Sequence, residues 1–189
     1  MNPDSVPDPA PLATSDWLGR TVTDLKGRQG VVRRVYQVGA VQVAILTATI
    51  LDPRSCPIWD EPLDLLARDD EGAAFPDYEQ LTDEVGRLEM SVVRGIASEG
   101  EADRYRTLRD QVAPYATAQS ALHFALITQV RAGDRVVDCL HNRQGTVLDP
   151  SLFHLKMTVR LDEAHRDDRW PDGVVDLYTP VLYPTLGLL

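Results

Sequence analysis

Apolar and polar residues alternate along the first third of the chain, a pattern that is typical of β-strands with one buried face. The alternation covers residues 19–25, 31–36, 41–50 and 59–66, and glycines or prolines separate these segments. We expect tight turns that use the glycines of Lys26–Gly30 and Gly39, because glycine tolerates positive φ. Pro62 predicts an edge strand, since proline cannot donate to a neighbouring strand. Residues 16–68 are therefore predicted to form a small antiparallel β unit.

The same pattern returns near the C-terminus. The run Gly133–Gly145 repeats the order Gly, Val, Asp and Arg-Gln-Gly that is present in Gly19–Gly30, with one extra residue. Further along, residues 158–161 match 43–46, and Trp170 matches Trp59. These landmarks come in one order in both halves. We therefore predict a second copy of the unit over residues 132–189.

The middle of the chain changes to a helical period. Leu81, Val85, Leu88, Val92 and Ile96 recur every three or four residues, which predicts one face of a helix. Residues 101–112 indicate a second helix and Pro114 the start of a third, because proline is accepted in a first helical turn. Residues 69–131 are thus predicted to be a helical connector. The Pro-rich residues 1–15 show no period and are expected to be a mobile tail.

Composition narrows the class of protein. The chain has 189 residues, 43% of them hydrophobic and 25% charged, which is typical of a globular protein. Its formal net charge is −10, and residues 69–131 contribute 6 Arg against 12 Asp and Glu. Such acidity disfavours nucleic-acid binding. Two cysteines do not make a disulfide framework, and no signal peptide or membrane span is evident, so we expect a cytoplasmic protein without membrane partners.

The run Gly19–Val32 and its copy resemble the first hairpin of Src-homology-3-like small β-barrels, particularly the KOW and Tudor types. The resemblance implies an α+β protein in which two small antiparallel β-barrels flank the helical middle. It also implies binding of protein segments or nucleic acid, with no catalysis and no cofactor. Tudor-type modules hold cations in aromatic cages. The candidate partner-binding aromatic residues are Tyr36, Trp59, Phe153, Trp170 and Tyr178.

One concentration of basic residues offers a candidate nucleic-acid contact. It consists of Lys26, Arg28, Arg33 and Arg34, around the first predicted hairpin. Strand alternation places Arg33 and Arg34 on opposite faces, so the four side chains are not expected to share one patch.

Catalytic signatures are weak. Cys139 and His141 have the spacing that could begin a metal site or activate a thiol, but His154 and His165 do not complete a ligand set. The strand pattern favours Cys139 as a small core residue. Carboxylates near His165 could support acid–base chemistry or could simply be solvated. No phosphate loop or nucleophile elbow is present. We predict no enzyme activity and no metal.

The leading hypothesis is a non-enzymatic adaptor that binds a protein partner through its paired β-barrels, possibly within a larger assembly. The outer strands and the Pro-rich loop before Trp59 are the expected contact surface, and two linked modules would gain affinity through effective concentration. The alternatives are a nucleic-acid-associated factor that uses the first hairpin, an acidic mimic of nucleic acid, and a phage-derived assembly protein. The helical segment could also mediate homo-oligomers.

Overall fold

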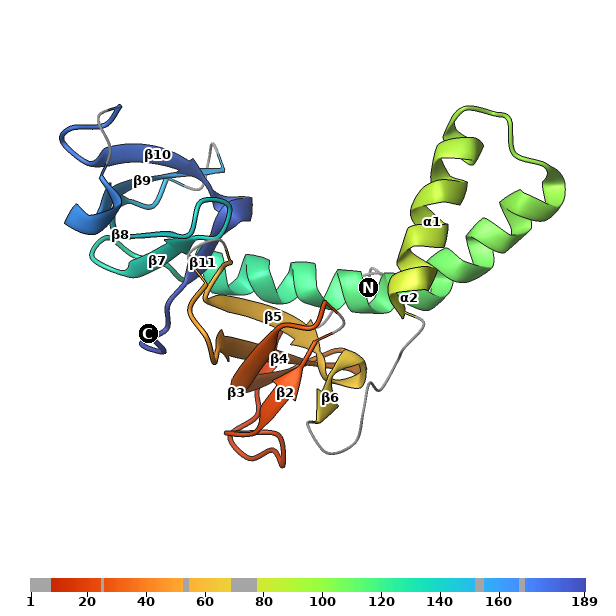
Figure 1. Cartoon of the computed structure of the whole chain (residues 1–189), viewed down its shortest axis with the longest axis horizontal. Coiled ribbons are helices and arrows are strands. Elements are labelled where there is room, and N and C mark those ends of the chain that lie inside the picture. The colour runs from red at the N-terminus through yellow and green to blue at the C-terminus, as the bar shows by residue number, and fades with distance from the viewer. Residues whose placement is uncertain (1–7, 25, 53–54, 69–77, 152–154, 167–168) are drawn as a thin grey trace.

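The α+β class predicted from the sequence is confirmed by a computed structural model, which describes residues 8–24, 26–52, 55–68, 78–151, 155–166 and 169–189. Two antiparallel sheets stand on either side of one end of a long helix, and a helical hairpin projects away from them (Figure 1). We call the first sheet, residues 10–68, unit one, and the second, residues 135–184, unit two.

Unit one is a meander with a short return strand. Its strands follow the order β5-β4-β3-β2-β6, and β1 pairs with β3. The elements are β1 (Ala10–Pro11), β2 (Thr21–Thr23), β3 (Gln29–Val38), β4 (Val41–Ala48), β5 (Ile58–Pro62), a 3-10 helix (Leu63–Leu65) and β6 (Ala67–Arg68). The edge position predicted for Pro62 is confirmed, because β5 lies at one end of the sheet. The single strand expected over 59–66 is wrong, since the chain turns through the 3-10 helix and then pairs with β2.

The expected tail is shorter than predicted. Ala10 and Pro11 pair with Gln37 and Tyr36, and the Leu12 amide donates to the carbonyl oxygen of Val35 at 2.8 Å. Proline is compatible with this edge position because β1 needs to pair on one side only. The prediction of a mobile tail is wrong for residues 10–12, and its first seven residues lie outside the described part of the chain.

Unit two repeats the topology of unit one. Its order is β10-β9-β8-β7-β11, which agrees with the predicted duplication. The elements are β7 (Arg135–Asp138), β8 (Arg143–Asp149), β9 (Lys156–Leu161), a 3-10 helix (Glu163–His165), β10 (Val174–Tyr178), a second 3-10 helix (Thr179–Val181) and β11 (Leu182–Pro184). In both units, a 3-10 helix precedes the last strand. No pairing among the described residues joins the two end strands of either sheet, so each sheet is an open ladder.

The strand registers correct the predicted alignment of the two copies. Val32 pairs with Leu46 and Val147 pairs with Val159, and a β-bulge follows both Val32 and Val147. Leu46 of unit one therefore corresponds to Val159 of unit two, whereas the predicted alignment of the two copies matched Leu46 with Leu161. The error is two residues, which keeps every side chain on the same face, so hydrophobic alternation could not reveal it.

The predicted match between Trp59 and Trp170 is wrong as well. Trp59 pairs with Leu46, and Val175 pairs with Val159, so the counterpart of Trp59 is Val175. Trp59 is buried within unit one, whereas Trp170 precedes β10 and is 40% exposed. The two tryptophans have different structural roles.

A buried Asp–Arg pair is the feature that the two units share most closely. Asp24 accepts hydrogen bonds from the main-chain amides of Lys26 and Arg28, and it also accepts from the Arg28 side chain at 2.6 Å. Asp138 likewise accepts from two following amides and from Arg143 at 2.8 Å. The repeated Asp and Arg of the sequence motif therefore close the hairpin turn, since a buried carboxylate needs such partners.

The matched glycines Gly30 and Gly145 serve close packing, and neither has a positive φ. Gly27 and Asn142 take the positive φ of the turns, which assigns the expected turn role of glycine to Gly27 and not to Gly30. A Cβ atom on Gly145 would lie 2.5 Å from Val159 Cγ1 and 2.6 Å from the Arg160 carbonyl oxygen.

We expect Gly145→Ala to lower the free energy of unfolding by about 2–3 kcal/mol, because the added methyl meets main-chain atoms that cannot move aside. Urea denaturation measures this loss. Gly100→Ala is the matched control, since nothing lies within 4 Å of its Cβ position and alanine favours the helix. Equal urea midpoints for Gly145→Ala and the wild type would contradict the packing role.

Two helices replace the three that were predicted. They are α1 (Tyr78–Val93) and α2 (Glu99–Thr128). Ser98 caps α2: its hydroxyl accepts from the Glu101 amide, and the Glu101 carboxylate accepts from the Ser98 amide at 2.8 Å. Pro114 lies inside α2 and does not begin a helix, and α2 is visibly bent in Figure 1. An interior proline removes one helical hydrogen bond and is a common cause of such a bend.

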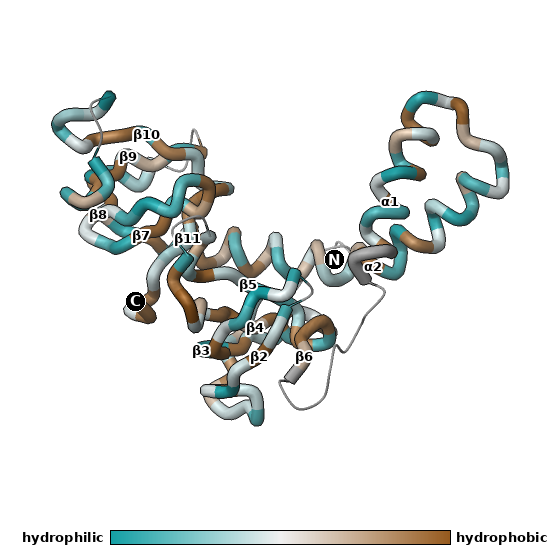
Figure 2. Tube along the Cα trace, viewed as in Figure 1, coloured by the Kyte–Doolittle hydropathy of each residue, from teal (hydrophilic) through white to brown (hydrophobic). Residues whose placement is uncertain are grey.

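The first part of α2 pairs with α1 to form the projecting hairpin (Figure 1). Leu88 and Leu108 are buried in it, and Arg104 bonds Glu84 at 2.8 Å. Much of the hairpin is teal to white in Figure 2, with a few brown segments. In the described part of the chain, neither helix has the length and apolar character needed to cross a membrane.

The second part of α2 packs against both units. Leu122 and Leu126 of α2 belong to one hydrophobic cluster with Ile45 and Ile58 of unit one and Val137 of unit two. Figure 1 shows α2 between β5 and unit two. The two units and the end of α2 therefore form one packed body, and not two modules on a loose connector.

Candidate functional site

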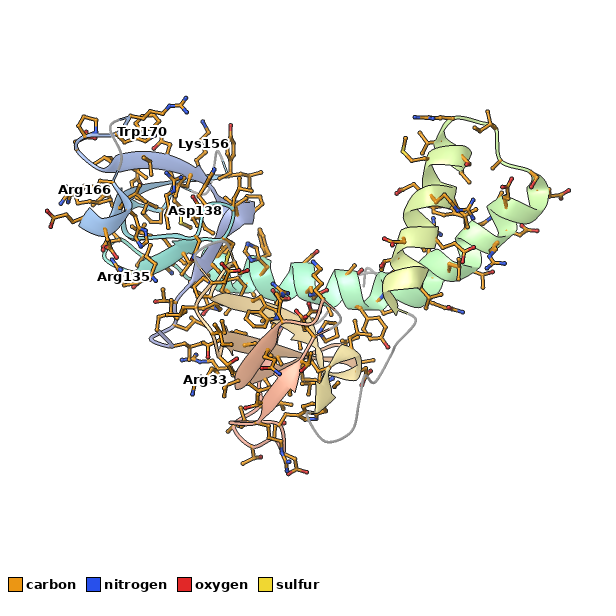
Figure 3. All side chains as sticks on the ribbon, viewed as in Figure 1. Arg33, Arg135, Asp138, Lys156, Arg166 and Trp170 are labelled. Atoms are coloured by element: carbon orange, nitrogen blue, oxygen red, sulfur yellow. A yellow bond between two sulfur atoms is a disulfide. The ribbon has the colours of Figure 1, made fainter. Side chains whose placement is uncertain are left out.

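The predicted aromatic residues do not gather into a cage. Tyr36 and Trp59 are buried and belong to different core clusters of unit one. Trp170 and Tyr178 are exposed in unit two, with Arg169 and Lys156 over their respective rings at 5.8 and 5.2 Å. Phe153 lies outside the described residues. Figure 3 shows Trp170 at the outer end of unit two, far from unit one.

The four candidate basic residues lie at two places, the turn between β2 and β3 and the bulge of β3. Arg28 is held by Asp24 inside unit one, and Lys26 is exposed on the neighbouring turn. Arg33 and Arg34 are both exposed, because the β-bulge after Val32 interrupts strand alternation. Arg34 pairs with Ile45 and Arg33 bonds Thr47, which lie on one face of β4, so the expectation that the two arginines lie on opposite faces is wrong. Their side chains donate to the hydroxyl of Thr47 and to the carbonyl oxygen of Leu186, at 2.8 and 3.1 Å.

Cys139 packs against the shared hydrophobic cluster, as expected of a small core residue, and it forms a disulfide with Cys56 that joins the two units and was not predicted. His141 Nδ1 lies 2.9 Å from an Asp138 carboxylate oxygen. Cys139 therefore has no thiol for nucleophilic attack. Among the described residues, no three His, Cys, Asp or Glu side chains are grouped so as to hold a metal ion.

Of the carboxylates near His165, Asp162 forms an ion pair, and Asp167 and Asp168 lie outside the described residues. Arg135 donates to the Asp162 carboxylate at 2.6 Å. This hydrogen bond lowers the pKa of Asp162 below its ordinary value, and the effect outweighs partial burial. Asp162 is thus an ion-pair partner of β7 and not a candidate acid or base.

A cavity of about 450 Å³ lies where unit one, unit two and α2 meet, and we call it the junction cleft. Its walls include Trp59 and Asp60 of β5, His123 of α2, Tyr183 of β11 and the disulfide. Successive residues of β5 point to opposite faces, which separates Trp59 in the interior of unit one from Asp60 on the side of α2. There, Gln119 Nε2 donates to the main-chain oxygen of Asp60 at 3.1 Å.

Three side-chain atoms around the junction cleft are buried without a hydrogen-bond partner in the described part of the chain. They are Trp59 Nε1, Asp60 Oδ2 and the Tyr183 hydroxyl oxygen. Buried polar atoms are nearly always paired, and each unpaired one costs about 1–3 kcal/mol. Because these atoms have no solvent-accessible surface, and Trp59 lies on the other face of β5 from Asp60, they are a cost of the packing around the cleft and are not groups that the cavity exposes.

Among the residues that line this cleft, Asp60 and Arg28 carry opposite charges. Arg28 is the nearby guanidinium, and it bonds Asp24 at 2.6 Å and Glu61 at 3.5 Å while lying 4.5 Å from the centre of the Trp59 ring. Burial raises the pKa of Asp60, although Gln119, His123 and Arg28 oppose the rise. Burial, together with Asp24 and Asp60, also raises the pKa of Glu61 to about 7.

The raised pKa of Glu61 predicts a pH-dependent stability. Its folded pKa exceeds its unfolded value, so the stabilising contribution is complete below about pH 4 and is lost as pH rises through about 7. We expect the free energy of unfolding of Glu61→Gln to match that of the wild type near pH 4 and to exceed it by about 2–3 kcal/mol near pH 8. Urea titrations across this range measure the difference. The exposed Glu163→Gln should show no such trend, and a Glu61→Gln variant that is weaker at pH 8 would contradict the prediction.

Two further cavities extend the junction cleft into a groove. One, of about 530 Å³, shares Asp60 and His123 with it and runs along α2 past Phe124 and Leu155, which are 64% and 57% exposed. The other, of about 250 Å³, shares Trp59 and runs past the exposed Ile50. The groove therefore has a polar centre and apolar flanks, an arrangement that suits an extended segment with a polar residue between apolar ones.

Of the predicted partner-binding residues, Trp59 reaches this groove, and Arg28 borders it although it was predicted for nucleic acid. Asp60, His123 and Tyr183 were missed, because they come from segments that are far apart in the sequence. The loop before Trp59, which was expected to be a contact surface, borders the groove through Ile50 and Ser55.

Comparisons with known proteins gave no match: no protein-family model fits the chain, and no curated protein and no solved structure is similar to it.

Proposed function

We propose that the protein is a non-enzymatic adaptor that binds an extended segment of a partner protein in the groove centred on the junction cleft. The observation that carries this proposal is a cavity between both units and α2 that continues past large exposed apolar side chains. A binding groove of this size and mixed character is typical of ligand sites, and large exposed apolar side chains mark interaction surfaces.

We further propose that each unit is a small β-barrel of the Src-homology-3-like kind. The support is the strand order, in which the fifth strand returns to pair with the first strand of the meander, and the 3-10 helix that precedes it in both units. This proposal concerns the scaffold. The binding site differs from the bivalent arrangement expected from the sequence, because both units and α2 contribute walls to one groove.

Selection of random linear peptides on the full chain tests the binding function. We expect enriched peptides that no longer bind Ser120→Trp, because Ser120 is exposed on α2 and borders the groove, where an indole would fill the space. Gln111→Trp is the matched control, since Gln111 is exposed on the same helix within the projecting hairpin. Peptides that bind both variants as well as the wild type, or no enrichment, would refute the groove as a binding site.

A further inference from the structure

The two units differ in what covers one edge of their sheets. Because Trp59 corresponds to Val175, β10 of unit two is the counterpart of β5 in unit one. Each of these strands lies at the end of its sheet and pairs with one neighbour, so its other edge depends on cover from outside the sheet. The cover of β5 therefore indicates what this edge of the unit accepts.

In unit one, α2 covers the open edge of β5. Hydrogen bonds between β4 and β5 fall at alternate residues, beginning with the Ala48 amide and the Pro57 carbonyl, so the main-chain groups of Asp60 point away from β4. Gln119 Nε2 of α2 donates to the Asp60 carbonyl oxygen at 3.1 Å. The edge of β5 is thus satisfied by an amide donor from a packed element.

In unit two, the corresponding edge of β10 is open. The Thr179 amide donates to the Leu155 carbonyl at 2.9 Å, which sets the alternation of the hydrogen bonds between β9 and β10. Both main-chain groups of Asp176 and the amide of Tyr178 therefore point away from β9, and they have no hydrogen-bond partner in the described part of the chain. Figure 1 shows β10 on the side of unit two that lies away from α2.

The outer faces of the two units explain this difference in cover. Val43 and Ile45 of β4 belong to the apolar cluster beneath α2. By the register of the two ladders, their counterparts in β9 are Lys156 and Thr158, which are polar and half-buried. A helix does not bury its apolar stripe against polar side chains, so α2 covers this face in unit one and leaves it uncovered in unit two.

Exposed aromatic rings lie at both ends of β10. Trp170 precedes the strand and Tyr178 is its last residue, and both are exposed (Figure 3). Arg169 and Lys156 lie over the respective rings. Tryptophan and tyrosine are enriched among the residues that dominate protein interfaces. The strand therefore presents open main-chain groups between two large side chains that are suited to contact.

We propose that an extended segment of a partner protein adds to unit two as a further strand beside β10. Its main chain bonds Asp176 and Tyr178, and its side chains alternate between the two faces of the sheet. Its residues on the face of Val175 and Leu177 are apolar, because that face is buried, and the residues between them are polar. None of the described residues that line the junction cleft belongs to β10, so this site goes beyond the proposed function.

Charge argues against a second copy of the chain as the occupant. The strand Val174–Tyr178 is centred on Asp176, so two antiparallel copies of β10 would place one Asp176 opposite the other. Like charges that face each other across paired strands are destabilising, and a charged residue on an edge strand opposes self-association. The occupant is therefore a segment of different sequence.

The probe is the peptide acetyl-Lys-Thr-Val-Thr-Val-Thr-Lys-amide, and its binding to the full chain is followed by amide NMR shifts. We expect saturable shifts centred on Asp176 and Tyr178. In an antiparallel addition, the residues that bond β10 have their side chains on the polar face, which assigns the hydrogen bonds to the threonine amides. N-methylation of the threonines should weaken binding by about tenfold or more, because several hydrogen bonds are lost. N-methylation of the valines should leave binding unchanged.

Asp176→Pro is the matching change in the protein. It removes the outward amide without removing a hydrogen bond to β9, and proline is accepted in an edge strand at such a position. We expect it to weaken the probe by about tenfold. Asp176→Asn keeps the amide and should bind like the wild type. Urea midpoints report whether both variants are folded, and the N-methylated peptides decide the question on the wild type if Asp176→Pro does not fold.

Ser120→Trp separates this site from the groove of the proposed function. It should bind the probe like the wild type, and a loss of binding would assign the peptide to the groove and reject β10. Equal binding of the two N-methylated peptides, or the absence of shifts in β10 with the unmodified probe, would also overturn the inference. A dimer of the full chain that Asp176→Pro dissociates would assign the edge to a second copy and reject a partner segment. Each of these results leaves the groove itself to be decided by the random-peptide selection.

Discussion

Cys139→Ser is expected to lower the free energy of unfolding by about 4 kcal/mol. The disulfide between Cys56 and Cys139 spans 83 residues, and closing a loop of that length removes substantial conformational entropy from the unfolded chain. It also ties unit one to unit two beside the junction cleft. Urea denaturation without reductant measures the loss.

The cysteine variants provide their own controls. The free energy of unfolding of Cys56→Ser should equal that of Cys139→Ser. The double variant should lose no more stability than either single variant, because all three remove the same bond. Dithiothreitol should lower the stability of the wild type to that of the variants and leave the variants unchanged. A wild type whose urea midpoint is the same with and without reductant would show that the disulfide does not stabilise the protein.

The second large effect is expected from Leu122→Ala, which should lower the free energy of unfolding by about 3–4 kcal/mol. Leu122 is fully buried in the cluster that unites Ile45 of unit one and Val137 of unit two. Removing its side chain loses the transfer free energy of the missing carbons and leaves a cavity that cannot collapse between three elements. Equilibrium urea unfolding, followed by circular dichroism, measures the cost.

Phe124→Ala is the matched control for Leu122→Ala, since Phe124 lies two residues further along α2 and is 64% exposed. It should change stability by less than about 0.5 kcal/mol. The wild type should unfold in one transition, because the shared cluster couples both units. Two separate transitions, or a cost below about 1 kcal/mol for Leu122→Ala, would show that the units are not coupled through α2.

The disulfide is relevant to the cellular compartment in which the protein occurs. Disulfides persist mainly in oxidising compartments. The cytoplasmic location expected from the sequence stays a prediction, and in a reducing environment the loss of stability described for Cys139→Ser would apply to the wild type. Mass determination of alkylated protein taken directly from the cell would report the state of Cys56 and Cys139.

Local patterns account for the part of the fold that the sequence predicted well. Strand alternation and turn glycines report which backbone conformation suits each residue, so the strands predicted over 19–25, 31–36 and 41–50 and the first helix have counterparts in the structure. The repeated Asp and Arg-Gln-Gly were recognised as a motif, because the Asp–Arg pair forms within one hairpin. An interaction between residues that are close in the sequence can therefore be recognised from the local sequence.

The predictions failed where the position of a residue depends on a packing or pairing partner that is distant in the sequence. The match of 158–161 with 43–46 slipped by two residues, since only pairing across the sheet sets the register. Pro114 was placed at a helix start, although α2 continues through it while packing against both units. Tertiary packing can outweigh the local cost of an interior proline.

The amino-acid sequence by itself determined the α+β class, the duplicated β unit and the acidic character of the helical middle, because each depends on residue type and spacing. Only the tertiary structure decided the disulfide and the junction cleft. Asp60, His123 and Tyr183 meet there because β5, α2 and β11 pack together. The unpaired polar atoms of Asp60 and Tyr183 are a property of that packing, and no spacing along the chain could express them.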